Sequence, residues 1–329
     1  MKLKIDNFVL SIIIVVVISY LFPQWGRSDS GVPLDKIASI GVALIFFFYG
    51  LKLSIDKLKT GLKNWKLHVL VQSSTFLLFP LIILSFYPFV SSAEGQTLWL
   101  SFLFLAALPS TVSSSVVMVS MAKGNLPAAI FNASISGLIG IFITPLWMGL
   151  FMEKSATEFQ LGDVYIKLVT EILGPVLLGL VLQRYLGKYA IKYASQLSIF
   201  DKSIILIIIY KSFAHAFDEG IFESVGLIDL TFISIASLVL FFVVLFITGF
   251  LSDWLGFSLE DKITAQFCGT KKSLVHGTVF SKILFPASFP VAMILLPLMI
   301  FHALQILIVS IIAAKWAKRI AMVNKDAQK

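Results

Sequence analysis

Two polar stretches interrupt apolar segments of the chain, and their residue types are those of a binding site. The first is Pro109 followed by five hydroxyl side chains, Ser110, Thr111, Ser113, Ser114 and Ser115. The second follows Gly269 and consists of Thr270, Lys271, Lys272 and Ser273. Hydroxyl groups donate and accept hydrogen bonds, and an ammonium group attracts anions. The two stretches are therefore the first candidates for a site that binds a small anionic ligand.

The two adjacent lysines are the most unusual feature, because a lysine at the centre of a membrane helix costs roughly 2.5–3.5 kcal/mol. Neighbouring residues of a helix point in directions about 100° apart. We therefore expect Lys271 to face the site, and Lys272 to project into a cavity or to snorkel towards water. The alternative is a cytoplasmic loop in which both lysines are solvated. Against it, residues 274–285 are too few to cross a membrane alone.

Other polar residues inside apolar segments leave two interpretations open. Gln72 and Asn132 could face a central cavity, or they could make contacts between helices. For His302 and Gln305 we expect hydrogen bonds between helices. Pro109 could simply kink its helix, because proline lacks a backbone N–H, whereas Gly269 permits backbone angles that other residues avoid.

A second group of ionisable residues lies near the end of another apolar segment. Lys211 and His215 are one helical turn apart, and Asp218 follows directly after them. This group could line the mouth of a pathway or an interface, or it could take part in coupling transport to an ion.

The composition indicates that membrane helices must position these residues. Hydrophobic residues make up 58% of the 329 residues and charged residues only 13%, against roughly 25% charged in soluble proteins. A helix that spans a bilayer needs roughly 17–25 mostly apolar residues. Ten segments qualify: 8–22, 37–51, 67–90, 98–122, 127–152, 164–186, 198–217, 230–252, 262–282 and 288–314.

The basic residues set the orientation of these segments. If both termini are cytoplasmic, 18 of the 26 Lys and Arg residues lie in inner segments, five lie in outer segments and three lie within spans. This asymmetry follows the positive-inside rule. The net charge of +8 therefore indicates topology and not a nucleic-acid partner. We expect a multi-pass protein of the plasma (inner) membrane with both ends inside.

Ten spans divide into five and five, so that any internal repeat must be inverted, as in many secondary transporters. The corresponding domains are 1–152 and 164–329, the latter with a cytoplasmic tail, joined by an outer connecting loop at 153–163. The polar interruption falls in the fourth span of each half. At 1.5 Å per residue, Pro109 lies about 16 Å from the outer face and Lys271 about 14 Å from the inner face. Two interruptions that enter from opposite faces thus reach the same depth.

Several motifs along the chain together resemble the bile acid:sodium symporter family, in its SBF-like branch. They are the stretches 46–53, 66–68 with Gln72, Leu108-Pro109 with its serines, 124–125 with 128–132, 143–146 and 267–274. The resemblance implies an all-α fold of ten helices in two inverted five-helix repeats. It also implies a panel domain, a core domain and two broken helices that cross at the membrane midplane.

One departure from the family pattern concerns the coupling ion. Sodium-coupled relatives carry Glu-x-Gly-x-Gln in the second broken helix, and its carboxylate binds sodium. Here Phe267 stands at the glutamate position and Lys271 at the glutamine position. A sodium site without its carboxylate lacks the charge balance that a hard cation requires. An ammonium near the carbonyl end of a half-helix could fill the space of the ion, so we do not expect the usual sodium site.

The resulting functional prediction is a secondary active transporter that moves a small organic anion by alternating access. We expect the substrate and the coupling ion to contact Gln72, Ser110, Thr111, Ser113, Ser114, Ser115, Asn132, Thr270, Lys271, Lys272 and Ser273. A proton is the candidate coupling ion, and we expect no cofactor and no metal. Oligomeric state and transport direction stay open. The alternative is a membrane regulatory or sensor protein of the same fold without net transport.

An enzyme is the least favoured class. The chain contains no His-Glu-x-x-His motif, no paired intramembrane aspartates and no Gly-x-Ser-x-Gly motif. These patterns would supply a metal site or an activated serine. The serine cluster also has no credible base nearby, although Lys271 could in principle act as one.

Overall fold

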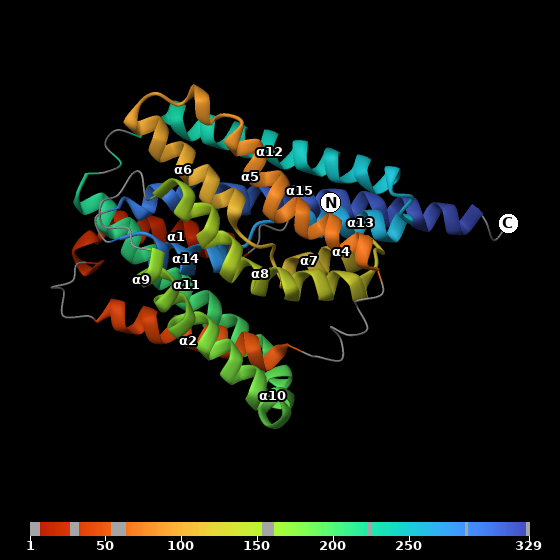
Figure 1. Cartoon of the computed structure of the whole chain (residues 1–329), viewed down its shortest axis with the longest axis horizontal. Coiled ribbons are helices and arrows are strands. Elements are labelled where there is room, and N and C mark those ends of the chain that lie inside the picture. Colours follow the sequence, from red (N-terminus) through yellow and green to blue (C-terminus); the bar gives the residue numbers. More distant parts are fainter. Residues whose placement is uncertain are drawn as a thin grey trace. The chain divides into compact units, whose positions relative to one another are not determined.

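A computed structural model describes residues 7–26, 33–53, 64–152, 161–220, 222, 225–286 and 289–326. Within these ranges every regular element is a helix (Figure 1), and each of the ten predicted segments contains helix. Among the described residues, six helical segments are long and apolar enough to cross a membrane: Leu34–Lys52, Trp65–Phe89, Leu126–Met152, Ile166–Lys192, Leu227–Trp254 and Val291–Lys318. The all-helical prediction is confirmed, and the inverted ten-helix repeat stays a prediction.

Six of the predicted segments form continuous α-helices. They are α1 (Asn7–Leu21), α2 (Leu34–Lys52), α8 (Leu126–Met152), α11 (Ala194–Asp218), α12 (Leu227–Trp254) and α15 (Val291–Asp326). A short helical turn, η1 (Pro23–Gly26), follows α1. Another, η3 (Tyr87–Phe89), lies just before the helix that begins at Ala93.

Two further segments pass through a π turn just before a proline. Helix α4 (Trp65–Ser73) continues through η2 (Ser74–Leu78) into α5 (Phe79–Leu84), and α9 (Leu161–Leu168) continues through η4 (Val169–Leu173) into α10 (Gly174–Lys192). Pro80 has no N–H for the carbonyl of Phe76 four residues earlier. The indole N–H of Trp147 donates to that carbonyl instead, at 2.9 Å.

The remaining two segments are broken helices, as the sequence predicts. Helix α6 (Ala93–Ala107) stops before Pro109, and α7 (Ser113–Met121) begins after it. Helix α13 (Leu259–Gly269) stops before the two lysines, and α14 (Leu274–Leu284) begins after them. The N-termini of α6 and α13 are capped by Ser92 and Ser258, whose hydroxyls accept N–H bonds at 3.1 and 3.2 Å.

The chain folds into two compact units, and each unit is assembled from three stretches of sequence. Unit 1 comprises Met1–Leu53, Met148–Leu230 and Val275–Leu296, and unit 2 comprises Ser54–Trp147, Thr231–Leu274 and Pro297–Lys329. Each unit draws on both halves of the sequence. The predicted division into 1–152 and 164–329 concerns an inverted repeat of the sequence. The grouping of contacts into two units does not test it. Most of the predicted loop 153–163 lies outside the described residues.

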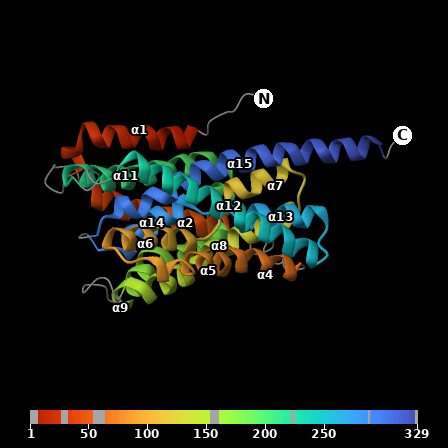
Figure 2. The same ribbon diagram turned by 90° about the horizontal axis from the view of Figure 1, so that it is seen from above.

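Unit 1 is held together by close helix packing. Helix α2 packs along α10 (Figure 1), and α1 packs along α11, as the turned view shows (Figure 2). A Cβ atom on Gly50 would lie 2.2 Å from the carbonyl oxygen of Val176, and one on Gly179 would lie 2.2 Å from that of Phe47. Two glycines therefore allow the backbones of α2 and α10 to approach, as small residues do in membrane helix pairs.

Unit 2 places α13 against α4 and α7. One carboxylate, that of Asp261 near the start of α13, accepts hydrogen bonds from the side-chain amides of Asn64 and Asn125, each at 2.7 Å. The backbone N–H of Asn125 also donates to Thr264 Oγ1 at 2.8 Å. These bonds fix the entry of α13 relative to α4 and to the turn before α8, and so they position the break that follows α13.

Candidate substrate and ion site

The two helix breaks lie against one another within unit 2. We call residues 108–112 and 270–273 together the crossing. The N–H of Ser273 donates to the carbonyl oxygen of Pro109 at 2.9 Å, and the hydroxyl of Ser110 donates to the carbonyl oxygen of Cys268 at 2.6 Å. The prediction that two broken helices meet is thereby confirmed. Because the bonds connect backbone to backbone and side chain to backbone, they set the register of the breaks.

Lys272 lies at the centre of the crossing, with no exposed surface. Its Nζ donates to three backbone carbonyl oxygens, those of Thr75 at 2.7 Å, Ala106 at 2.5 Å and Leu108 at 2.9 Å. It also lies 4.2 Å from the ring centroid of Phe79, within range of a cation–π interaction. An ammonium has three N–H donors, so the three carbonyls match a charged lysine. A neutral amine would leave one of them without a donor.

The chain leaves these three carbonyls without backbone partners for local reasons. In a π turn a carbonyl bonds the N–H five residues later, and for Thr75 that residue is Pro80, which has none. The partner expected for the carbonyl of Ala106 is the N–H of Ser110, which donates instead to the hydroxyl of Ser136 at 2.9 Å. The third carbonyl belongs to Leu108, the C-cap residue directly after α6, where no helical donor follows. Carbonyls at a helix C-terminus also carry partial negative charge.

Lys271 is also completely buried, but its surroundings differ. Its Nζ donates to one carbonyl oxygen in the described structure, that of Ser114 in the first turn of α7, at 2.8 Å. Two sequence-based alternatives are therefore wrong. Lys272 does not snorkel, and the lysine segment is not a solvated loop. Residues 270–273 are not helical, and so the 100° separation of helical neighbours does not apply and both side chains point inwards.

A side-chain amide on α15 holds the backbone of Lys272. Gln305 Oε1 accepts the N–H of Lys272 at 2.8 Å, and Gln305 Nε2 donates to the carbonyl oxygen of Lys272 at 2.8 Å. Nε2 also lies 2.9 Å from His302 Nδ1. The predicted role of Gln305 in bonding another helical segment is confirmed, whereas the bond of His302 lies within its own helix, so that its predicted interhelix role stays a prediction. Nothing in the sequence indicates that the target of Gln305 is the backbone of Lys272.

The hydroxyl groups of the predicted site differ in their hydrogen-bond partners. Thr111 Oγ1 lies 2.8 Å from the hydroxyls of both Ser114 and Ser115, in the same first turn of α7 that Lys271 contacts. Thr270 Oγ1 donates to the carbonyl oxygen of Gln266 in its own helix at 2.6 Å. The side chain of Ser113 lies outside what the structure describes.

Two predicted site residues form a separate cluster in unit 2. Gln72 Nε2 donates to Asn132 Oδ1 at 3.1 Å, and Asn132 Nδ2 lies 2.9 Å from His68 Nδ1. Asn132 is completely buried, and these bonds connect α4 to α8. Of the two interpretations left open, contacts between helices are what the geometry supports. Gln72 Oε1 is buried and has no hydrogen-bond partner among the described residues.

Gly269 has a role different from the one expected. It ends α13 without entering the left-handed region, which among the described glycines only Gly220 and Gly256 occupy. A Cβ atom at Gly269 would lie 3.2 Å from that of Ser74. Its small size lets η2 approach α13, and this approach brings the Thr75 carbonyl to Lys272.

Residues 6–318 match the model of the SBF-like CPA transporter family. The chain belongs to that family. Relatives include the "Putative symporter YfeH" of Escherichia coli, 36% identical over 96% of this chain and 94% of the relative. The "Sodium/bile acid cotransporter 7-B" of Xenopus laevis is 31% identical over 94% of this chain and 91% of the relative. An uncharacterized protein of Pseudomonas aeruginosa is 37% identical over 95% and 93%.

Family membership establishes the broad class of the protein. It is a multi-pass membrane protein of a transporter family, in the SBF-like branch of the bile acid:sodium symporters, and it is not an enzyme. The prediction of the family from the motifs is confirmed.

Proposed function

We propose that the protein is a secondary active transporter of a small organic anion, working by alternating access around the crossing. The names of its relatives refer to symport and to sodium/bile acid cotransport. Two fully buried lysines at a helix break are expensive in a membrane, and residues of this kind mark ion and substrate pathways. In this proposal ten spans form two inverted repeats in the inner membrane, and both termini are cytoplasmic.

The observation that carries the proposal is the cage of three carbonyl oxygens around Lys272 Nζ. Oxygen atoms from a π turn and from the end of a half-helix are the ligands that a transporter of this kind offers to a sodium ion. Here a tethered ammonium already supplies one positive charge and one donor to each oxygen. We infer that Lys272 replaces a sodium ion permanently, so that transport does not require sodium.

Lys271 is the better candidate for a group that changes its charge during transport. It donates to one carbonyl in the described structure, and a neutral amine, with two N–H groups, can keep that single bond after losing a proton. Lys272, with three acceptors, cannot. The substrate anion would contact charged Lys271 and the hydroxyls of Thr111, Ser114 and Ser115, and the proton would couple transport to the pH gradient.

The experiment begins with a thermal-shift screen of organic anions, each with sodium chloride or choline chloride and at two pH values. An anion that stabilises the protein is then tested for uptake into proteoliposomes with an imposed pH gradient. The proposal predicts uptake that depends on the pH gradient and persists in choline chloride. In Lys271→Gln, collapse of the gradient should no longer change the rate of uptake. Binding without uptake or counterflow would favour the sensor function instead.

A further inference from the structure

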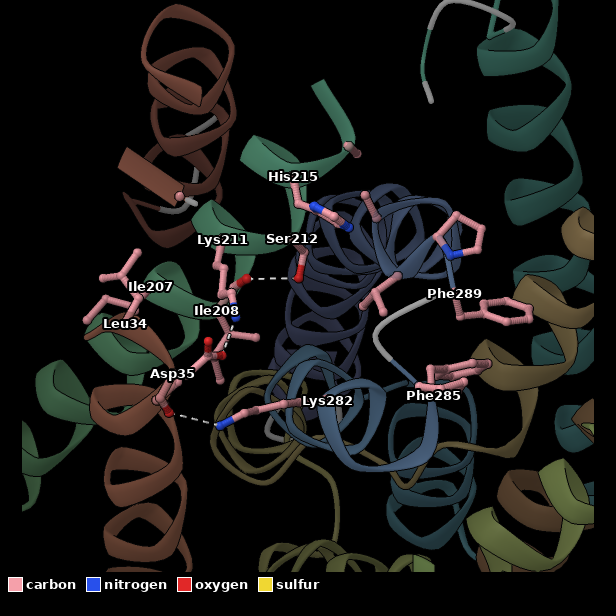
Figure 3. A pocket seen from close by; sticks show the side chains of 17 residues that line it. Leu34, Asp35, Ile207, Ile208, Lys211, Ser212, His215, Lys282, Phe285 and Phe289 are labelled. Atoms are coloured by element: carbon pink, nitrogen blue, oxygen red, sulfur yellow. Dashed lines mark hydrogen bonds and ion pairs between the residues drawn. The ribbon is translucent and has the colours of Figure 1, made fainter. Parts of the chain in front are cut away.

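A cavity in unit 1 combines charged and aromatic residues that the proposed function does not use. It has a volume of about 320 Å³ and lies among the start of α2, the last turns of α11, the end of α14 and the start of α15. Its ionisable lining residues are Asp35, Lys211, His215 and Lys282, and its phenylalanine lining residues are Phe285 and Phe289. The two kinds lie on different sides, with Lys282 directed towards Asp35 and the two rings on the far side (Figure 3).

The bonds among the charged residues leave the lining with a positive charge. Lys211 forms an ion pair with Asp35, the one acidic residue among the described residues that line the cavity. Lys282 Nζ donates to the hydroxyl of Ser39 at 2.5 Å and to the backbone carbonyl oxygen of Asp35 at 3.4 Å. Neither of these partners is charged. Since an ammonium has three donors, Lys282 keeps one N–H beyond these two bonds within the part of the chain that the structure describes.

Of the two carboxylates that act electrostatically on Lys282, Asp35 lines the cavity and Glu171 does not. His215 lies 3.4 Å from Glu219, one turn further along α11, and Glu219 does not line the cavity. Asp35 is paired with Lys211, whose own positive charge acts against that of Lys282. A ligand in the cavity therefore meets a lysine ammonium whose direct partners are neutral.

The apolar residues of the lining indicate which kind of group the rest of a ligand would carry. The rings of Phe285 and Phe289 have centroids 5.1 Å apart, and Pro286 and Pro290 of the same stretch also line the cavity. Ile207 and Ile208 add apolar surface on the side of Asp35 (Figure 3). Liquid water occupies roughly 30 Å³ per molecule, so the cavity holds a ligand of about ten heavy atoms. We propose that this cavity is a binding site for a small monocarboxylate with an aromatic or branched apolar group, whose carboxylate bonds Lys282.

The proposal goes beyond the proposed transport function, because none of these residues belongs to the crossing. If either the transport proposal or the cavity proposal fails its test, the other can still be tested. A protein that transports an anion but does not bind the probe described below would overturn this inference alone.

The test measures binding of 4-fluorobenzoate to the full-length protein in nanodiscs by fluorine NMR, with empty nanodiscs as the blank. The neutral 4-fluorobenzamide is the matched probe. Variant Lys282→Gln removes the charge, Lys282→Arg keeps it, and Lys36→Gln removes a charge from an exposed neighbouring position that does not line the cavity.

We expect saturable binding of the benzoate, weakened about tenfold or more in Lys282→Gln, as for loss of a hydrogen bond to a charged group. Binding should persist in Lys282→Arg and in Lys36→Gln, and the benzamide should bind much more weakly. Absence of saturable binding to the unmodified protein would overturn the proposal. So would equal binding of the benzamide, or equal losses in Lys282→Gln and Lys36→Gln.

Discussion

Replacing Lys272 by alanine should make the stability of the protein depend on sodium. The substitution leaves three buried carbonyl oxygens without their donor. At about 1 kcal/mol for each unsatisfied group, the lower end of the range, the free energy of unfolding falls by about 3 kcal/mol. The space vacated by the side chain is lined by the same three oxygens. A sodium ion at about 100 times its dissociation constant would restore about 2.7 kcal/mol, nearly the whole loss.

Thermal unfolding of the purified protein in sodium chloride and in choline chloride, at equal ionic strength, measures this effect. The unmodified protein should unfold at the same temperature in both salts, whereas Lys272→Ala should be destabilised in choline and rescued by sodium. Lys272→Met is the matched control, because its side chain fills the vacated space without donating. It should be destabilised equally in both salts. Rescue of the methionine variant, or no rescue of the alanine variant, would refute the idea that these oxygens form a cation site.

Two further substitutions test the helix packing within unit 1 and the hydrogen bonds that position the crossing within unit 2. Gly179→Ala should lower the free energy of unfolding, measured by denaturant titration, by about 1–3 kcal/mol, since its Cβ would collide with a backbone carbonyl. The control is Gly162→Ala, where nothing lies within 4 Å, and it should be neutral or stabilising. Equal effects of the two substitutions would contradict the close approach of α2 and α10. Asp261→Ala should cost about 2 kcal/mol or more and loosen α13, because it leaves the amides of Asn64 and Asn125 unpaired. Faster hydrogen exchange confined to α13 would support this role, and unchanged exchange would contradict it.

The positions of the helices and of both breaks could be predicted from the sequence because their causes are local. Pro109 and the polar run after Gly269 interrupt apolar segments, and the two interruptions, which we expect at one depth, are bonded to one another. The same reasoning could not assign the lysines. It assumed helical geometry at residues 270–273, and the residues that bond Lys272 lie far away in the sequence, at 75, 106 and 108.

The cavity in unit 1 could not be predicted from the sequence for the same reason. Lys211 and His215 were recognisable as a pair one turn apart on a helix. Lys282 and Asp35, however, come from distant stretches of sequence that only the assembled unit 1 brings together. Likewise, no sequence pattern reveals that the amide of Gln305 bonds both backbone groups of Lys272.

Uptake by the unmodified protein in sodium-free proteoliposomes tests the central claim most directly. The substrate would be an organic anion that stabilises the protein in the thermal-shift screen. If Lys272 permanently takes the place of a sodium ion, the initial rate with an inward proton gradient is the same in choline chloride as in sodium chloride. Uptake that stops when sodium is removed, or radioactive sodium that enters together with the substrate, would contradict the claim.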